Sequence, residues 1–472
     1  MDNDKFTPAG FQYTKDQQKA LNSMIDWSYK TDHFYILSGA AGTGKTTLIK
    51  EFIKSNKFNV GIVVTAPTHK AVRIASQKAG LNGSTIQKLL GLRPNMNIED
   101  FDINNPKFDP RSRKAIMDHS LIIIDETSMI NTGLYTMINT EALKYNVKVL
   151  FVGDEYQLPP IKDRNISPAF TKPKHKYNLT EIVRQSSDNP LLKLLDVVRD
   201  DVKNRTFNFI KFINKNSSAF NNTGKGYVSA TRENFRDFMV NAFKSDFYST
   251  DIDFCKFSAF TNNNVLAWNS FIRSEMYKEE TAKKVIIRDD LITAYSTLLD
   301  EFQAQIIVNS EDYIIDDIQD YKNQSNIEGY IVRFRKVFGG QFTPYMFIVD
   351  TANEKNVLRF LGIANNLIRE AKIASSSQRY RKWENYYKFK DSNLLIKSLF
   401  NDQGKLIVKK DLDYGYCLTI HKTQGSTYQH VFVNVRNIIY NKNGRPYPDQ
   451  TLRNKLLYVA ISRATDSATL LV

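Results

Sequence analysis

Gly39-Ala-Ala-Gly-Thr-Gly-Lys-Thr46 decides the fold, because this run matches the pattern G-x-x-x-x-G-K-[ST] in full. A short apolar run at 33–38 (HFYILS) precedes it, and a helical pattern at 45–54 follows it. The glycines let the backbone wrap around phosphate oxygens, and the helix N-terminus adds its positive dipole end. The alternative is a glycine-rich turn that binds nothing, and the flanking strand and helix argue against it. The sequence therefore predicts a phosphate-binding loop.

Two side chains of this loop have distinct expected roles. Lys45 is placed to neutralise the β- and γ-phosphates of a nucleotide, and Thr46 to hold Mg²⁺. Nucleotide contacts are expected from the whole loop and the first helical turn: Gly39, Ala40, Ala41, Gly42, Thr43, Gly44, Lys45, Thr46 and Thr47.

Acidic and amide side chains follow the next predicted strands. Asp125 and Glu126 end the apolar run at 121–125, where Asp125 is expected to bind Mg²⁺ and Glu126 to act as the base for the attacking water. A salt-bridged strand end is the alternative, which the phosphate loop makes improbable. Gln157 follows the run at 147–153 and is a candidate for orienting that water.

The wider pattern predicts an α/β protein. Apolar strands at 33–38, 60–65, 121–125 and 147–153 alternate with helices, which indicates a parallel sheet covered on both faces. A second α/β block begins near 184, with a strand at 254–260 and a helix near 264–277. The pattern then becomes β-rich from about 300 to 350, suggesting a small β-barrel, and helical over 354–400. From 414 the α/β pattern returns.

Composition narrows the class of protein. The chain has 472 residues, 65 Lys and Arg against 50 Asp and Glu, and a net charge of +15, which favours a polyanionic partner such as nucleic acid. A basic surface that only keeps the protein dispersed explains the charge equally well. Two cysteines exclude a disulfide scaffold and fit a reducing compartment. The first ten residues do not read as a secretory signal and no apolar run is long enough for a membrane helix, so we expect a cytoplasmic protein without a membrane partner.

Short segments, taken in chain order, resemble the motifs of the superfamily 1 helicases. They are Gln17 in TKDQ, GAAGTGKT (39–46), TAPTHKA (65–71), STIQKLLG (84–91), DETSM (125–129), GDEYQLPP (153–160), LTEIVRQ (179–185), AFTNNN (259–264), TIHKTQGST (419–427) and YVAISRA (458–464). The forms DE-x-S-M, GD-x-x-QLPP and IHK-[ST]-QG look like the B branch, which includes RecD, Pif1 and phage Dda-type enzymes.

The resemblance implies two RecA-like lobes with ATP between them. The lobes would span 1–90 with 114–183 and 184–300 with 401–472; a pin insertion would span 91–113 and an SH3-like β-barrel with helices 301–400. Gln17 would read the adenine, and Arg184 and Arg463 would act as arginine fingers from the second lobe.

Single-stranded DNA would cross both lobes. The matching contact positions are Thr65, Pro67, His69, Thr85, Thr261, Asn263, Thr419, His421 and Gln424. Gln87 departs from the histidine that is frequent in this branch. The pin would offer an apolar tip from Phe101, Ile103 or Phe108, although these side chains could equally pack the insertion onto the first lobe. The basic, aromatic stretch 366–390 would brace the barrel or face DNA.

Together these readings predict an ATP- and Mg²⁺-dependent helicase that moves 5′→3′ and separates forked duplex DNA as a monomer. It would serve phage DNA replication or recombination in the host cytoplasm, with single-strand-binding or replisome proteins as possible partners. A translocase that displaces bound proteins, an RNA track, and a nucleotide-switched recruitment module are the alternatives.

Overall fold

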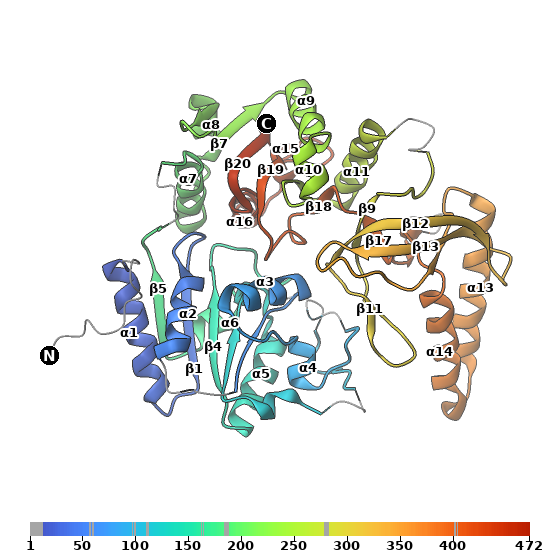
Figure 1. Ribbon diagram of the computed structural model, residues 1–472, viewed down its shortest axis with the longest axis horizontal. Coiled ribbons are helices and arrows are strands. Elements are labelled where there is room, and N and C mark those ends of the chain that lie inside the picture. The colour runs from blue at the N-terminus through green and yellow to red at the C-terminus, as the bar shows by residue number, and fades with distance from the viewer. Residues whose placement is uncertain are drawn as a thin grey trace. The chain divides into compact units, whose positions relative to one another are not determined.

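The computed structural model describes residues 13–55, 58, 61–96, 98, 101–109, 113–161, 163, 165–183, 188–277, 283–400, 403 and 405–472 (Figure 1). The chain divides into two compact units. The first unit comprises 1–265 with 418–472 and contains two α/β lobes; the second comprises 266–417. No helix within the described ranges is long and apolar enough to cross a membrane.

The first lobe is built on a five-stranded parallel sheet in the order β2-β3-β4-β1-β5. Its strands are β1 (Phe34–Gly39), β2 (Ile62–Thr65), β3 (Leu121–Ile124), β4 (Lys148–Gly153) and β5 (His175–Leu179). The central strands β3 and β4 are buried along their whole length, as expected for a sheet covered on both faces. The predicted parallel sheet is therefore confirmed, with strand limits within two residues of those read from the sequence.

Helices pack on both faces of this sheet. The helices are α1 (Lys15–Tyr29), α2 (Lys45–Ser55), α3 (His69–Ala79), α4 (Ile86–Leu90), α5 (Thr132–Lys144) and α6 (Pro168–Thr171). Side chains of α1 and α2, such as Trp27 and Phe52, pack with Tyr35 and Leu37 of β1. Ile36, which points to the other face, packs with α4, α5 and α6. Successive residues of β1 thus serve two separate cores.

The second lobe has a six-stranded sheet in the order β18-β8-β19-β20-β7-β6. The strands are β6 (Ser218–Phe220), β7 (Gly226–Ala230), β8 (Cys255–Ala259), β18 (Cys417–Thr419), β19 (Tyr428–Asn434) and β20 (Ala464–Leu471). The β8-β19-β20-β7 core is parallel, and β6 pairs antiparallel with β7.

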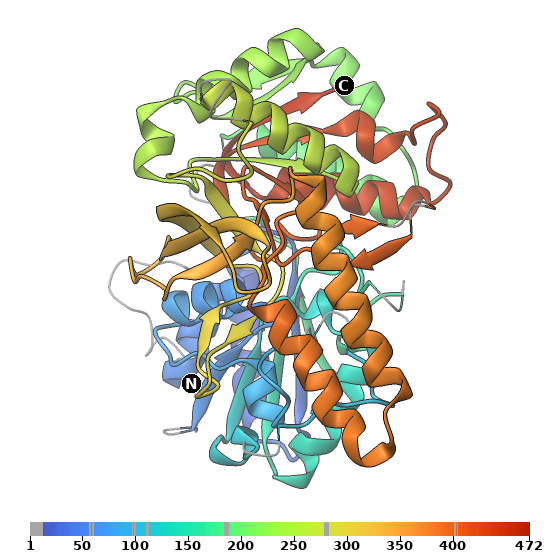
Figure 2. The ribbon, with the colours of Figure 1, turned by 90° about the vertical axis from the view of Figure 1, so that its right-hand side faces the viewer.

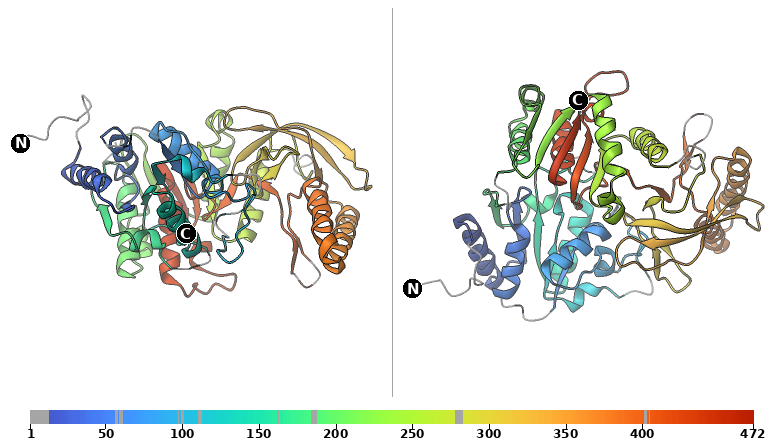
Figure 3. Two further views of the ribbon diagram at one scale, coloured as in Figure 1. Left: turned by 90° about the horizontal axis from the view of Figure 1, so that it is seen from below. Right: turned by 45° about the horizontal axis from the view of Figure 1, so that its top comes forward.

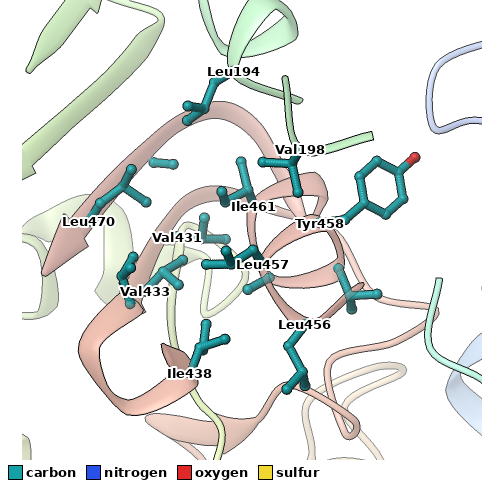
Figure 4. Packing of buried hydrophobic residues seen from close by; sticks show 14 of the residues in the cluster. Leu194, Val198, Val431, Val433, Ile438, Leu456, Leu457, Tyr458, Ile461 and Leu470 are labelled. Atoms are coloured by element: carbon teal, nitrogen blue, oxygen red, sulfur yellow. The ribbon is translucent and has the colours of Figure 1, made fainter. Parts of the chain in front are cut away.

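Its helices also lie on both faces. They are α7 (Leu191–Asn204), α8 (Phe209–Lys215), α9 (Arg232–Phe243), α10 (Asp246–Thr250), α15 (Val435–Ile439) and α16 (Gln450–Ser462). Helices α7 and α16 pack with Val431 and Val433 of β19 in one apolar cluster (Figure 4). Phe432, on the opposite face of β19, contacts Phe235 of α9. Figure 3 shows α7 and α9 flanking the sheet. Helix α11 (Asn262–Met276) begins in this unit and runs into the second.

The second unit combines an antiparallel sheet, in the order β14-β13-β12-β9-β17, with a helical hairpin. The elements are β9 (Leu291–Ala294), β10 (Leu298–Leu299), β11 (Gln305–Ile307), β12 (Asp312–Lys322), β13 (Glu328–Lys336), β14 (Met346–Val349), α13 (Glu354–Ile373), α14 (Ser376–Asp391), β15 (Leu399–Phe400), β16 (Leu406–Val408) and β17 (Leu412–Tyr414). Helices α13 and α14 run side by side (Figure 2). The helical region predicted over 354–400 thus ends at Asp391, and β15 occupies its last two residues.

Candidate active site

The phosphate-binding loop joins β1 to α2. Gly42 and Gly44 adopt φ angles of 88° and 84°, a region that favours glycine. A Cβ on Gly44 would lie 2.3 Å from the Nε2 of Gln17, so the Gln17 side chain would have to move to admit it. The loop turns back so that the N-terminus of α2 begins at Lys45, where its free N–H groups and dipole favour an anion.

Lys45 lies against the loop. Its Nζ donates hydrogen bonds to the carbonyl oxygens of Gly39, at 2.6 Å, and Ala40, at 2.9 Å. Burial lowers the pKa of Lys45, and the charges of Asp154, Asp125 and Glu126 oppose that shift. The loop carbonyls therefore hold the ammonium group in place, and the three nearby acids favour its charged form. In this position it can also bind a phosphate.

Two acids follow β3. The backbone N–H of Asp125 donates to the carbonyl of Thr65, and Glu126 adopts φ 51° while its own N–H donates to the Asp125 carboxylate. Burial, and then the charge of Asp125, raises the pKa of Glu126 to about 7. Burial likewise raises the pKa of Asp125. A left-handed backbone at a non-glycine residue is typical of functional sites, and a carboxylate with a pKa near neutrality is suited to take a proton.

A cavity of about 130 Å³ between the two lobes of the first unit brings the predicted catalytic groups together. Its lining includes Lys45, Thr46, Asp125, Glu126, Gln157 and Arg463. Five of these come from the first lobe, and Arg463 comes from the second, at the end of α16. Residues more than 400 positions apart in sequence thus meet at one site.

Arg463 is held by its own lobe. Its guanidinium donates to the carbonyl oxygens of Val459 and Ser426 and to the hydroxyl of Ser462. Its charge lowers the pKa values of both Asp125 and Glu126, against the larger effect of their burial. Arg184, the other predicted finger, lies outside the described residues.

Gln17 is held beneath the loop. It forms a capping box with Thr14 at the start of α1, and its Nε2 donates to the carbonyl of Thr43 at 3.2 Å. The neighbouring Asp16 accepts hydrogen bonds from Tyr177, Thr180 and the N–H of Glu181. This network fixes Gln17 next to the segment that follows β5.

The donor set at the cavity fits Mg²⁺ that arrives with a nucleotide. Thr46 supplies a hydroxyl and Asp125 a carboxylate, and Mg²⁺ characteristically takes one or two protein ligands plus substrate phosphates. The described part of the chain has no group of three or more His, Cys, Asp or Glu that could hold a metal alone. The raised pKa values of Asp125 and Glu126 mark two buried acids that a cation would stabilise.

The structure separates the predicted DNA contacts by exposure. Thr65 and Pro67 are buried, with Thr65 fully shielded from solvent, and the DNA contacts expected of both stay predictions. Gln424 is also buried, and its amide donates to the Gln157 side chain at 3.5 Å. Gln424 thus joins the two lobes, and the DNA contact expected of it stays a prediction.

The other positions keep at least partial exposure: His69, Thr85, Thr261, Asn263, Thr419 and His421. Thr85 caps α4, and Thr261 is held by Asn437, whose Oδ1 accepts from the N–H groups of Phe260 and Thr261. Burial lowers the pKa of His69 to about 4 and lowers that of His421. The sequence motifs did not point to Asn437 as the residue that positions Thr261, because none of them contains it.

The 91–113 insertion is anchored to the first lobe. Phe101 is 3% exposed and belongs to the lobe core, so it takes the packing role that the sequence left open. Ile103 and Phe108 are 39% and 42% exposed. Gln87, at the position where the family often has histidine, donates to the carbonyl of Met96 and so ties the insertion to α4.

The fold and the cavity define a class. The first unit has two α/β lobes with parallel sheets, and the cavity beside the phosphate-binding loop lies between them. This is the arrangement of a P-loop ATPase with two RecA-like lobes. Residues 12–215 match the family model described as AAA domain, and residues 414–471 match the UvrD-like helicase C-terminal domain.

Known proteins agree with this class. The chain is 26% identical over 470 residues to the ATP-dependent DNA helicase dda of Enterobacteria phage T4, covering 95% of this chain and 97% of that one. It is 24% identical to the RecD subunit of the RecBCD enzyme from Buchnera aphidicola subsp. Schizaphis graminum, over 95% and 74% of the two chains.

A Bacteroides Pif1 helicase structure in complex with ADP-AlF3 and single-stranded DNA superposes with a TM-score of 0.50 at 16% identity, covering 97% and 92% of the two chains. Over nearly its whole length the chain is similar to superfamily 1B helicases of the Pif1-, RecD- and Dda-like group, and it is a P-loop ATPase of the DNA helicase class.

Proposed function

We propose that this protein uses ATP and Mg²⁺ to move 5′→3′ along single-stranded DNA and to separate duplex ahead of it. The observation that carries the proposal is the cavity that joins Lys45, Glu126 and Gln157 of the first lobe to Arg463 of the second. A nucleotide bound there would contact both lobes, so hydrolysis would change how tightly they close.

The candidate catalytic and nucleotide-binding residues each have a proposed role in hydrolysis. The loop and Lys45 bind the β- and γ-phosphates, and Thr46 with Asp125 holds Mg²⁺, which when bound neutralises phosphate charge. Gln157 orients the attacking water, and Glu126 accepts its proton. Arg463 balances the charge that develops on the γ-phosphate, and we assign the same role to Arg184. Gln17 reads the adenine.

The DNA track follows from the relatives and the charge. The T4 relative is named a DNA helicase, and the Bacteroides Pif1 structure contains single-stranded DNA. The net charge of +15 suits a phosphate backbone, so affinity is expected to fall steeply with salt. Exposed Asn263 and partly exposed Thr85, Thr261, Thr419, His69 and His421 are proposed DNA contacts, the hydroxyl and amide side chains among them to phosphate. Polarity rests on the family alone.

The insertions complete the proposed motor. The 91–113 segment would act as the pin at the fork, and its exposed Ile103 and Phe108 are the tip candidates that remain. The 301–400 region, with the sheet and the α13–α14 hairpin, would form the SH3-like barrel and its helical brace. We retain the boundaries proposed from the sequence for the first lobe and the pin, and we extend the second insertion beyond 301–400 to take in β9 and β17, which belong to its sheet.

Three other functions are compatible with the same ATPase site. A translocase that removes proteins from DNA would hydrolyse ATP equally well, and forked-duplex unwinding beside streptavidin displacement separates the two. An RNA track is tested by comparing ATPase stimulation by the two polymers. A nucleotide-switched recruitment module predicts turnover slower than intrinsic GTPases. A role in phage replication or recombination, as a cytoplasmic monomer with replisome partners, is a further proposal.

Lys45→Ala tests the site. We expect it to abolish DNA-stimulated ATP hydrolysis and to leave single-strand binding largely intact, because Lys45 lies at the phosphate loop. Lys50→Ala is the matched control, since Lys50 lies on the same helix and is exposed. Unchanged hydrolysis in Lys45→Ala would refute the assignment. Unwinding of one duplex with either a 5′ or a 3′ tail then tests polarity.

A further inference from the structure

Helix α16 ends at Ser462, directly before Arg463, and it carries another side chain that reaches the first lobe. We propose that Tyr458 is a positioning residue, which ties the phosphate-binding loop to the second lobe and so couples ATP hydrolysis to lobe closure. This inference rests on the proposed function, because it concerns how the ATPase site is assembled.

The Tyr458 hydroxyl makes two hydrogen bonds across the lobe boundary. It accepts from the backbone N–H of Ala41 at 3.1 Å and donates to the Asp154 carboxylate at 2.6 Å. Ala41 belongs to the phosphate loop, and both Ala41 and Asp154 line the cavity. One hydroxyl of the second lobe therefore fixes two groups of the first lobe at the catalytic site.

Tyr458 is well suited to hold that position. Its side chain is 1% exposed, and its ring belongs to the apolar core of the second lobe, with the hydroxyl directed away from the cluster (Figure 4). Burial and the adjacent Asp154 charge raise its pKa well above the usual value, so the hydroxyl keeps the proton that it donates. The core sets where the hydroxyl lies.

Asp154 links the Tyr458 hydroxyl to the turn that carries Gln157. Its Oδ1 accepts from the N–H of Tyr156 at 3.0 Å, and its carbonyl accepts from the N–H of Gln157 at 3.2 Å. The other carboxylate oxygen, Oδ2, bonds to Tyr458. Asp154 thus shapes the turn that presents Gln157 to the cavity while one of its oxygens is held by the second lobe.

A second anchor on α16 supports the same loop. The Nζ of Lys455 donates to the carbonyl oxygens of Glu155, at 2.8 Å, and Gln157, at 3.0 Å. The ring of Tyr156 meets that of Tyr458 edge-on at 6.0 Å, and Leu158 lies within the core of the second lobe. The 154–158 loop leaves the first lobe but is held by the second.

The consequence is a fixed spacing between two catalytic groups. Arg463 follows Tyr458 by five positions at the end of the same helix, so α16 links Arg463 to Gln157 through Tyr458 and Asp154. If the lobes part, Tyr458 leaves Ala41 and Asp154 at once. The water-orienting group, the phosphate loop and the arginine then lose their common alignment, which is how opening would stop hydrolysis.

Tyr458→Phe is the test variant, because it keeps the ring in the core and removes only the hydroxyl. Tyr227→Phe is the matched control, since Tyr227 is as deeply buried in the same cluster but is not among the cavity-lining residues. Both variants and the unmodified protein are compared for melting temperature, kcat and KM for ATP with saturating oligo-dT, and oligo-dT affinity with and without a non-hydrolysable ATP analogue.

We expect Tyr458→Phe to melt within about 3 °C of the unmodified protein. Its DNA-stimulated kcat should fall about 10- to 100-fold, with a KM changed less than about 3-fold. The change in oligo-dT affinity that the analogue produces should shrink, because the link between nucleotide and lobes is weakened. A side chain with a merely structural role would change the melting temperature and leave that coupling intact.

Asp154→Asn tests the link from the other lobe. It keeps the oxygen for Tyr156 but places an amide donor where Tyr458 needs an acceptor. It should reproduce the loss in kcat and coupling, and the double variant should add little. If Tyr458→Phe has the same kcat and the same nucleotide-dependent change in oligo-dT affinity as the unmodified protein, the inference is wrong. If Tyr458→Phe does not fold, the same result in Asp154→Asn would overturn the inference. An unmodified protein without DNA-stimulated hydrolysis would instead overturn the proposed function.

Discussion

Gly425→Ala tests how closely the two lobes must meet at the catalytic acids. Gly425 has φ +74°, and an added Cβ would lie 3.0 Å from the Cβ of Ala71 and 3.6 Å from the Cγ of Glu126. The left-handed backbone costs about 1–2 kcal/mol for alanine. The contact with Ala71 must also relax by a few tenths of an ångström, which moves the second lobe away from Glu126. Since a 1 Å misplacement can cost 10²-fold in rate, we expect kcat to fall about 5-fold.

Gly444→Ala is the matched control for this prediction. Gly444 has φ +72°, and a Cβ there would have no neighbour within 4 Å. Both variants carry the same backbone cost, so their melting temperatures should fall together by about 2–8 °C. Steady-state ATPase assays with saturating oligo-dT, well below the melting temperature, isolate the contact. Equal kcat values in the two variants would show that the close approach to Ala71 has no part in catalysis.

Three further predictions concern separate parts of the first unit. Phe101→Ala should lower the free energy of unfolding in urea by about 3–5 kcal/mol, because it empties a core site. Ile103→Ala and Phe108→Ala should leave that free energy nearly unchanged and should lower forked-duplex unwinding. Unwinding equal to that of the unmodified protein would remove them as tip candidates. Arg463→Gln should lower kcat by about 10³-fold with DNA binding retained, and a loss no larger than that of the control Lys50→Ala would exclude the finger role. The pKa of His69 is about 4 in the folded protein and 6.5 in the unfolded chain. Between pH 6.5 and pH 4 the unfolded chain therefore binds a proton that the folded protein does not, so the stability of the fold falls as the pH drops through this range. The cost reaches about 2 kcal/mol at pH 5, and His69→Gln should flatten the urea-monitored difference between pH 7.5 and pH 5 by that amount.

Local chemistry allowed much of this site to be predicted. The loop from Gly39 to Thr46 encodes its own conformation, because glycines permit the positive φ angles and the following helix supplies the anion site. Asp125, Glu126 and Gln157 were found because parallel strands end at one edge of a sheet, so residues that follow each strand become neighbours. Runs of apolar residues likewise predicted the parallel strands.

Exposure and long-range pairing could not be predicted in the same way. Phe101, Ile103 and Phe108 lie within eight residues of one another, yet of the three only Phe101 enters the core, and its carbonyl accepts a hydrogen bond from Asn131. Thr65 lies in a recognisable motif and is still shielded from solvent. Burial depends on what the rest of the chain places over a residue, and periodicity within a short segment does not contain that information.

The sequence by itself determined the phosphate loop, the acids beside it and the two α/β blocks, because each is specified by residues within one turn or strand. Only the tertiary structure decided how the blocks are joined at the site. Tyr458 reaches Ala41 and Asp154 across 417 and 304 positions, and Lys455 reaches the Gln157 carbonyl across 298. Such pairs form because a buried polar group must find a partner wherever the folded chain brings one, and no local pattern encodes that meeting.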